Sequence, residues 1–292
     1  MVAPETPAVV TVQYGPGAEN AFGAIAQAYS DRAPILFLPT GYPRGSTAAA
    51  PNFDASRSFR HITKWCERAE RIEQLPQLIQ HAFSRLRNGA PGPVLLELPI
   101  DLLNEKFPGT SYDYHPPRRS KPQADPAEIS DLIDALLAAR CLVIVAGQGV
   151  LNSGAWQELR DLAEHLEAPV MTTPNGKSAF PEDHPLALGT GGKSRPEAVD
   201  SFLDQADMIL GVGTSFTRSL YVTAIPPGKT MVQVTIDEAD LAKDYPIALG
   251  IIGDARAVLQ QILQELSSRD MLRRETGIAG AVNAARRRFL DR

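Results

Sequence analysis

The residues in this sequence that are best suited to bind a ligand are glycines and residues with hydroxyl or carboxylate side chains that directly follow short apolar runs. The first of them is Gly15–Asn20, with the sequence GPGAEN, which comes after the apolar run 8–12 and predicts a strand, a tight turn and the start of a helix. Glycine permits the backbone geometry of a sharp turn, and a helix start presents free N–H groups. The same arrangement returns later in the chain, at Gly147, Gly149, Thr172, Gly213, Thr214, Asp237 and Asp254.

A parallel sheet is needed to bring these residues together. Short β-rich runs alternate with longer amphipathic stretches along the chain, which is typical of βαβ units and predicts an α/β fold. Open α/β sheets bind ligands at the carboxyl ends of their strands, where glycine N–H groups and hydroxyls can hold a diphosphate. The alternative is that the glycines serve only to form turns.

The apolar periodicity also predicts where the elements lie. In the first part we expect helices at 18–29 and 75–86, and strands at 9–13, 34–39 and 93–99. In the second part we expect helices at 129–139, 155–166, 196–205 and 255–266, and strands at 141–146, 169–173, 207–213, 230–236 and 249–252. A proline-rich stretch without periodicity separates the two parts. We therefore predict domains at 1–105 and 127–268, a linker at 106–126 and a helical tail at 269–292.

Composition excludes several classes of protein. With 292 residues, 43% hydrophobic and 22% charged, the chain is long enough for two globular domains. A net charge of −5 argues against a nucleic-acid partner. No apolar run approaches the length of a membrane span and the first residues do not resemble a secretory signal, so a cytoplasmic location is expected.

The sequence predicts no metal site. Cys66 and Cys141 lie far apart and are expected to be ordinary reduced residues. The histidines show no ligand spacing; they are His61, His81, His115, His165 and His184.

Taken in order, several segments resemble the thiamine-diphosphate-dependent decarboxylase and acetolactate synthase family. Gly15–Asn20 resembles the GPGATN-type segment of that family, and 176–185 resembles its G-x-x-x-FPEDHP loop. Further similar segments lie at 33–38, 63–65, 90–94, 146–150, 206–213 and 253–255. The resemblance implies a partial pyrimidine-binding-type parallel sheet domain, followed by a six-stranded-type doubly wound central domain.

The resemblance also implies cofactor sites. Gly15, Pro16 and Gly17 would contact thiamine diphosphate. The later glycines, threonines and aspartates match the central-domain crevice in which flavin-binding members of the family hold FAD. Residues 215–217 replace an arginine–phenylalanine–aspartate segment of those members, which removes a cation from the diphosphate. FAD binding and a vestigial pocket both remain open.

Two residues are substrate-side candidates. Gln13 precedes the GPG turn, where its amide could bind a substrate carboxylate; the alternative is a polar residue at a strand end. Phe53 and Asp54 stand where synthases of the family carry a phenylalanine–glutamine pair, and the alternative is a surface loop. An unpaired Asp54 would repel a carboxylate substrate.

Two features of the family pattern are not matched in this sequence, and their absence determines the function that we expect. The sole acid before Gly15 is Glu5, which does not match the glutamate that activates the cofactor, and no GDG segment for magnesium and diphosphate follows Leu266. We therefore expect a partial decarboxylase or carboligase for 2-oxo acids, inactive alone, in a homo-oligomer or with a complementary catalytic chain. Magnesium would bind outside this sequence. The alternatives are a non-catalytic FAD- or ADP-type nucleotide-binding module and a structural subunit of a split enzyme.

Overall fold

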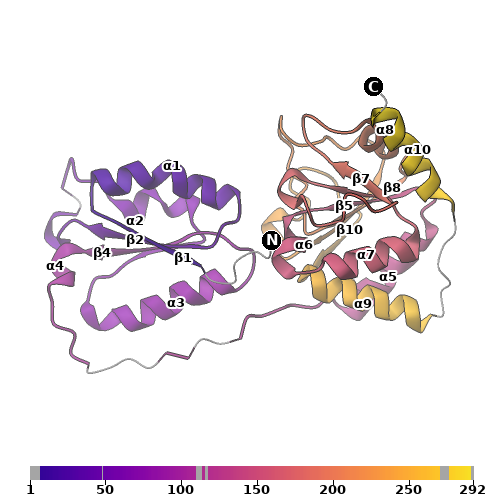
Figure 1. The fold of residues 1–292 in the computed structure, drawn as a ribbon. Coiled ribbons are helices and arrows are strands. Elements are labelled where there is room, and N and C mark those ends of the chain that lie inside the picture. The colour runs from indigo at the N-terminus through magenta and orange to yellow at the C-terminus, as the bar shows by residue number, and fades with distance from the viewer. Residues whose placement is uncertain (1–6, 48, 110–113, 116–117, 270–275, 291–292) are drawn as a thin grey trace. The chain divides into compact units, whose positions relative to one another are not determined.

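The computed structural model describes residues 7–47, 49–109, 114–115, 118–269 and 276–290 (Figure 1). The chain divides into two compact units, Pro4–Ser120 and Lys121–Arg292. The boundary between the units falls inside the segment 106–126, for which the sequence predicts a linker. The exact domain bounds given above stay predictions.

The first unit is built on a parallel sheet with the strand order β1-β2-β4-β3. Its strands are β1 (Ala8–Val12), β2 (Ile35–Gly41), β3 (Trp65–Arg68) and β4 (Val94–Pro99). Its helices are α1 (Pro16–Ser30), α2 (Ala55–Ser58), α3 (Leu75–Arg87) and α4 (Ile100–Leu103). Phe37 and Leu95 pack against α1 and α2, whereas Leu36 and Val94 pack against α3, so helices cover both faces of the sheet (Figure 1).

The second unit contains a six-stranded parallel sheet with the order β10-β9-β8-β5-β6-β7. Its strands are β5 (Leu142–Ala146), β6 (Val170–Thr172), β7 (Ala187–Thr190), β8 (Met208–Val212), β9 (Thr230–Thr235) and β10 (Leu249–Ile252). Its helices are α5 (Pro126–Ala138), α6 (Gln148–Ser153), α7 (Trp156–Leu166), α8 (Glu197–Gln205), α9 (Ala255–Ser268) and α10 (Ile278–Leu290). Helices α5, α7 and α9 cover one face, and α8 and α10 cover the other (Figure 1).

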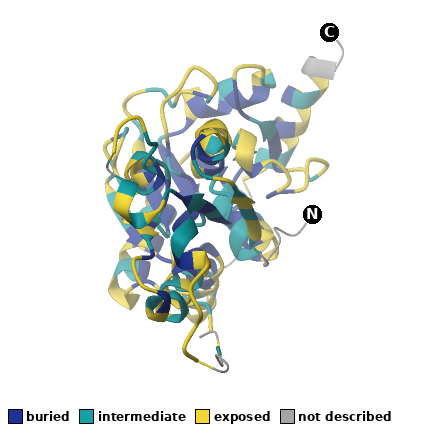
Figure 2. Ribbon diagram, turned by 90° about the vertical axis from the view of Figure 1, so that its left-hand side faces the viewer, coloured by how far each residue is buried: buried dark blue, intermediate teal, exposed yellow. Residues whose placement is uncertain are grey.

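Burial explains why these sequences form strands. Residues 142–146 of β5 and 208–212 of β8 are buried throughout, as expected for parallel strands covered on both faces. Figure 2 shows buried residues along the sheets and exposed residues on the outward sides of the helices. The α/β fold with parallel sheets and a doubly wound six-stranded second domain is therefore confirmed.

Five of these strands and helices were not predicted from the sequence: β3, β7, α2, α4 and α6. Strands β3 and β7 are short and lie at the edges of their sheets, where one side is free of pairing and an apolar run is not required. Helices α2 and α4 have four residues each and α6 has six, too few to show helical periodicity.

Candidate functional site

The GPG segment has the local structure that its sequence predicts. Gly15 caps α1 with a φ of 65°, and Pro16 is the first residue of that helix. A Cβ atom on Gly15 would lie 2.8 Å from the hydroxyl oxygen of Tyr42, which follows β2. The positive φ therefore favours glycine at this position, whereas the Tyr42 hydroxyl, at the end of a side chain, could move aside. The turn stands at the carboxyl edge of the first sheet, where α/β proteins bind ligands.

The two substrate-side candidates lie on separate segments of this unit. Gln13 is exposed after β1, and its side chain lies beside Gly17. Phe53 is half-buried before α2, with its ring edge-on to that of Phe59 at 6.3 Å between centroids. Phe53 is thus fixed partly in the core rather than carried on a free surface loop. Their contact with a substrate stays a prediction.

Asp54 is the N-terminal cap of α2. Its Oδ1 atom accepts hydrogen bonds from the backbone N–H of Arg57 and from the Ser56 hydroxyl, both at 2.9 Å. A carboxylate at a helix start interacts favourably with the free N–H groups and the helix dipole. These hydrogen bonds reduce the repulsion that an unpaired Asp54 would exert on an anionic substrate.

Sequence reasoning missed a second acid at this edge. Glu97 lies near the end of β4, is 1% exposed, and accepts a hydrogen bond from the backbone N–H of Ser56 at 2.9 Å. Burial raises the pKa of this carboxyl group, against the opposing effect of the Ser56 N–H. The signal was available in the sequence, because a charged residue interrupts the otherwise apolar run 94–99.

The side chains of the threonine–lysine segment, Thr63 and Lys64, form hydrogen bonds with backbone carbonyl groups of the first unit. The Thr63 hydroxyl donates to the carbonyl of Phe59 at 2.9 Å, and Lys64 Nζ donates to the carbonyls of Arg85 and Asn88 at 2.6 and 2.8 Å. Lys64 thereby satisfies carbonyl groups at the end of α3, where a cation is favoured.

In the second unit, the strand order reverses between β5 and β8, which is the position at which doubly wound sheets form a ligand crevice. The loops after these strands carry Gly147, Gly149 and Gly213, as predicted. They lie in direct backbone contact: a Cβ on Gly149 would lie 2.6 Å from the Cα of Gly213, and one on Gly147 would overlap the Gly213 carbonyl. Gly176 also approaches a neighbouring backbone closely, because a Cβ on it would lie 2.5 Å from the carbonyl oxygen of Ala146.

The N–H groups of these glycines are already hydrogen-bonded within the protein. Those of Gly147, Gly149 and Gly213 donate to the carbonyl oxygens of Val212, Gly213 and Val234, each at 2.9 Å. A donor engaged in this way is not free to bind a phosphate oxygen. The close packing of the two loops therefore explains these glycines without a ligand.

The predicted hydroxyl ligands also have protein partners. The side-chain oxygens of Thr172 and Thr190 lie 3.0 Å apart, and Thr172 is buried. Thr214 is buried as well, and its hydroxyl oxygen accepts the N–H of Phe216 at 3.3 Å.

The two predicted aspartates cap helical turns. Asp237 accepts the N–H of Ala239 at 3.1 Å. Asp254 is 1% exposed and accepts the N–H groups of Arg256 and Ala257, in the first turn of α9, at 3.1 and 3.2 Å. Capping accounts for aspartate at both positions. The role of these residues in cofactor binding stays a prediction.

The described residues do not fit a flavin diphosphate in the manner that the sequence suggests, because the expected glycine donors are engaged. Among the same residues, no group of three or more His, Cys, Asp or Glu side chains is placed to hold a metal ion. Cys66 and Cys141 are free thiols, and burial raises the pKa of Cys66 to about 12.

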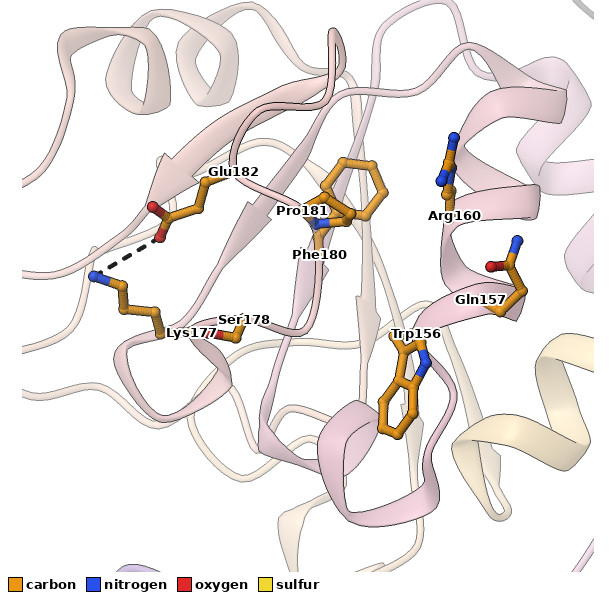
Figure 3. Close-up of a pocket in the computed structure, with 8 residues that line it drawn as sticks. All are labelled: Trp156, Gln157, Arg160, Lys177, Ser178, Phe180, Pro181 and Glu182. Atoms are coloured by element: carbon orange, nitrogen blue, oxygen red, sulfur yellow. Dashed lines mark ion pairs between the residues drawn. The ribbon is translucent and has the colours of Figure 1, made fainter. Parts of the chain in front are cut away.

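A pocket of about 420 Å³ lies elsewhere in the second unit, between α7 and the segment 177–182 (Figure 3). Its lining residues are Trp156, Gln157, Arg160, Lys177, Ser178, Phe180, Pro181 and Glu182. Both cations face carboxylates: Arg160 lies 2.9 Å from Glu164, and Lys177 lies 3.8 Å from Glu182. The pocket contains none of the residues predicted to bind a cofactor.

Within the part of the chain that the structure describes, no helix combines the length and the apolar character needed to span a bilayer.

Two family models match the sequence. Residues 2–65 match the thiamine pyrophosphate enzyme N-terminal TPP binding domain, and residues 129–262 match the thiamine pyrophosphate enzyme central domain.

Relatives and solved structures agree with these matches. A probable acetolactate synthase large subunit of Methanocaldococcus jannaschii is 33% identical over 271 residues, which cover 90% of this chain and 46% of that protein. A 3D-(3,5/4)-trihydroxycyclohexane-1,2-dione hydrolase of Lacticaseibacillus casei is 31% identical over 281 residues, covering 88% and 42%. The crystal structure of benzoylformate decarboxylase from Polynucleobacter necessarius superposes with a TM-score of 0.79 at 24% identity, covering 94% of this chain and 52% of that one.

The chain thus spans about half the length of the curated relatives it matches. Its two parallel sheets, and the order in which the two family models match along the sequence, agree with the predicted resemblance. The chain belongs to the thiamine pyrophosphate-dependent enzyme family, of which it carries the N-terminal and central domains.

Proposed function

We propose that this chain supplies one wall of the active site, together with the central domain, of a thiamine-diphosphate-dependent enzyme that acts on a 2-oxo acid in the manner of acetolactate synthase. The observation that carries the proposal is the carboxyl edge of the first sheet, which lies in the unit matched by the TPP binding domain model. The Gly15 turn, Phe53 and the buried Glu97 all stand at or near this edge. Thiamine diphosphate would supply nucleophilic chemistry toward the carbonyl group of a 2-oxo acid, and the Gly15–Gly17 turn would contact it.

The residues of this chain have binding and orienting roles in the proposal. The Gly15–Gly17 turn, in which Pro16 alone carries a side chain, lets the cofactor approach the backbone closely, and Phe53 offers an apolar face. Gln13 has an amide that can donate to a carboxylate, but it does not titrate near neutral pH and so takes no part in acid–base chemistry.

In this proposal the chain does not carry out the reaction alone. It acts with a complementary catalytic chain that contributes the magnesium and diphosphate ligands, in an assembly that can also contain a second copy of itself. Two observations support this: the described residues contain no cluster suited to a metal ion, and Glu97 is too deeply buried to contact a cofactor. A 2-oxo acid substrate, magnesium and the cytoplasmic location all belong to the proposal.

Isothermal titration of thiamine diphosphate and magnesium into the chain tests it. We expect no tight binding, because only one side of the site is present. Submicromolar binding would show that the chain holds a complete cofactor site and would overturn the proposal of a shared one.

A nucleotide-binding module is the competing function, and the engaged glycine donors of the second unit count against it. Its test is the colour of the purified protein. A flavin absorbance band that persists through purification would favour the module, and its absence together with cofactor binding in the presence of a partner chain would favour the shared site.

A further inference from the structure

Glu97 is the one carboxylate buried to this degree among the described residues of the first unit, and the proposed function assigns it no contact with cofactor or substrate. It lies on β4 in the middle of an apolar sequence. Burying an acid in this way costs free energy unless its oxygens find partners. The groups that contact the Glu97 carboxylate therefore indicate its role.

One carboxylate oxygen reaches the start of α2. Glu97 Oε2 accepts the backbone N–H of Ser56 at 2.9 Å, although the two residues are 41 positions apart in the sequence. The other oxygen lies against Gly41 at the end of β2, where a Cβ atom would overlap Oε1. Glycine at position 41 thus leaves room for the acid, and the acid bridges the sheet to the helix.

The first turn of α2 is held from several sides. Asp54 accepts the Ser56 hydroxyl and the Arg57 N–H, and the Cys66 thiol donates to the Ser56 carbonyl at 3.0 Å. The hydrogen bond from the Ser56 N–H to Glu97, in contrast, joins α2 to β4, an interior strand of the sheet. Phe53 immediately precedes the cap residue Asp54, and its ring packs edge-on against Phe59.

Two charged groups face Glu97 from neighbouring elements. Arg68 pairs with it in register on β3 and favours its ionised form, whereas Asp54 at the start of α2 opposes ionisation. Arg68 Nε and Nη2 are buried without a hydrogen-bond partner in the described structure, and Nε lies 3.5 Å from Glu70. No hydrogen bond to Arg68 therefore competes with Ser56 for the carboxylate of Glu97.

We propose that Glu97 is a positioning residue, which fixes the start of α2 from inside the sheet and thereby sets the place of Phe53 at the carboxyl edge. The assignment of Phe53 to the substrate side rests on the proposed function. The mechanical coupling from Glu97 to Ser56 and Phe53 does not, and it is testable without any cofactor.

The experiment is amide hydrogen exchange and aromatic NMR on the full chain without ligand. Glu97→Ala removes the acceptor, and we expect the Ser56 amide to exchange roughly tenfold faster or more, with displaced ring signals of Phe53. Glu97→Gln keeps an acceptor of the same shape and should restore most of the protection. Glu67→Gln, at an exposed acid on β3, is the matched control and should change neither signal.

A merely structural role predicts a different pattern. If Glu97 only stabilised the unit as a whole, Glu97→Ala would accelerate exchange in the sheet as much as at Ser56, and that result, or unchanged Ser56 and Phe53 signals, would overturn the proposal. If Glu97→Ala does not fold, the wild type and Glu97→Gln still decide the question. The change of the Ser56 amide shift with pH should then be clearly larger in the wild type than in Glu97→Gln, which keeps the Asp54 contact; an equal change in both would refute the coupling.

Discussion

Replacing Gly213 by alanine should destabilise the second unit more than any ordinary loop substitution. Gly213 has a φ of 60°, and a Cβ there would lie 2.7 Å from both Gly149 Cα and Val150 N. The positive φ costs an L-residue about 1–2 kcal/mol, and forcing an atom between two packed backbones costs about 1–3 kcal/mol more. We therefore expect the free energy of unfolding to fall by about 2–5 kcal/mol, the sum of the two ranges.

Gly228→Ala is the matched control. Gly228 also has a positive φ, 82°, but no atom lies within 4 Å of the position its Cβ would take. The control therefore shares the conformational cost with Gly213→Ala and lacks the overlap. The difference between the two variants isolates the backbone contact at the reversal of strand order and should be about 1–3 kcal/mol.

Urea unfolding followed by tryptophan fluorescence measures both variants. The protein has two tryptophans, Trp65 in the first unit and Trp156 in the second. In a Trp65→Phe background, the signal reports the second unit alone. Equal losses of stability in Gly213→Ala and Gly228→Ala would refute the conclusion that the loops after β5 and β8 are in backbone contact.

Three further substitutions test particular contacts. Asp254→Ala removes the cap of α9 and should lower the stability of the second unit by about 1–2 kcal/mol, with Asp254→Asn recovering most of it in the same urea assay. Lys64→Met removes charged donors from the end of α3 and should cost the first unit about 1–3 kcal/mol, read from Trp65 fluorescence in a Trp156→Phe background; no loss would mean that solvent replaces the contact. For Glu97→Gln, burial raises the folded-state pKa above 4.5, so the wild type loses stability relative to the variant as pH rises above that value. A wild type that instead gained stability relative to Glu97→Gln as pH rises, in urea titrations, would contradict the raised pKa.

The sequence predicted the architecture well because the parallel strands are buried on both faces and their apolar runs are nearly continuous. The runs at 141–146 and 207–213 each match a strand to within one residue at each end. The edge strands β1 and β10 were predicted, whereas the edge strands β3 and β7 were not; β3, with the sequence Trp-Cys-Glu-Arg, has no such run. An edge strand is therefore predicted from the sequence only where it carries an apolar run of its own.

The site residues were harder to interpret because one residue type serves several physical purposes. Glycine at 147, 149 and 213 suits a diphosphate loop, yet it is equally required where two backbones touch, and only the fold brings those loops together. Asp254 precedes a helix and was recognisable as a cap from its position alone. Glu97 was recognisable as unusual, but its partner Ser56 is distant in sequence, so its role needed the structure.

The central claim is that the carboxyl edge of the first sheet forms one wall of a thiamine diphosphate site. Amide NMR of the full chain during titration with thiamine diphosphate and magnesium tests this most directly. The account predicts weak binding, with the largest shifts at the Gly15–Gly17 turn and near Phe53. Largest shifts at Gly147, Gly149 and Gly213, or saturation at submicromolar cofactor, would contradict it.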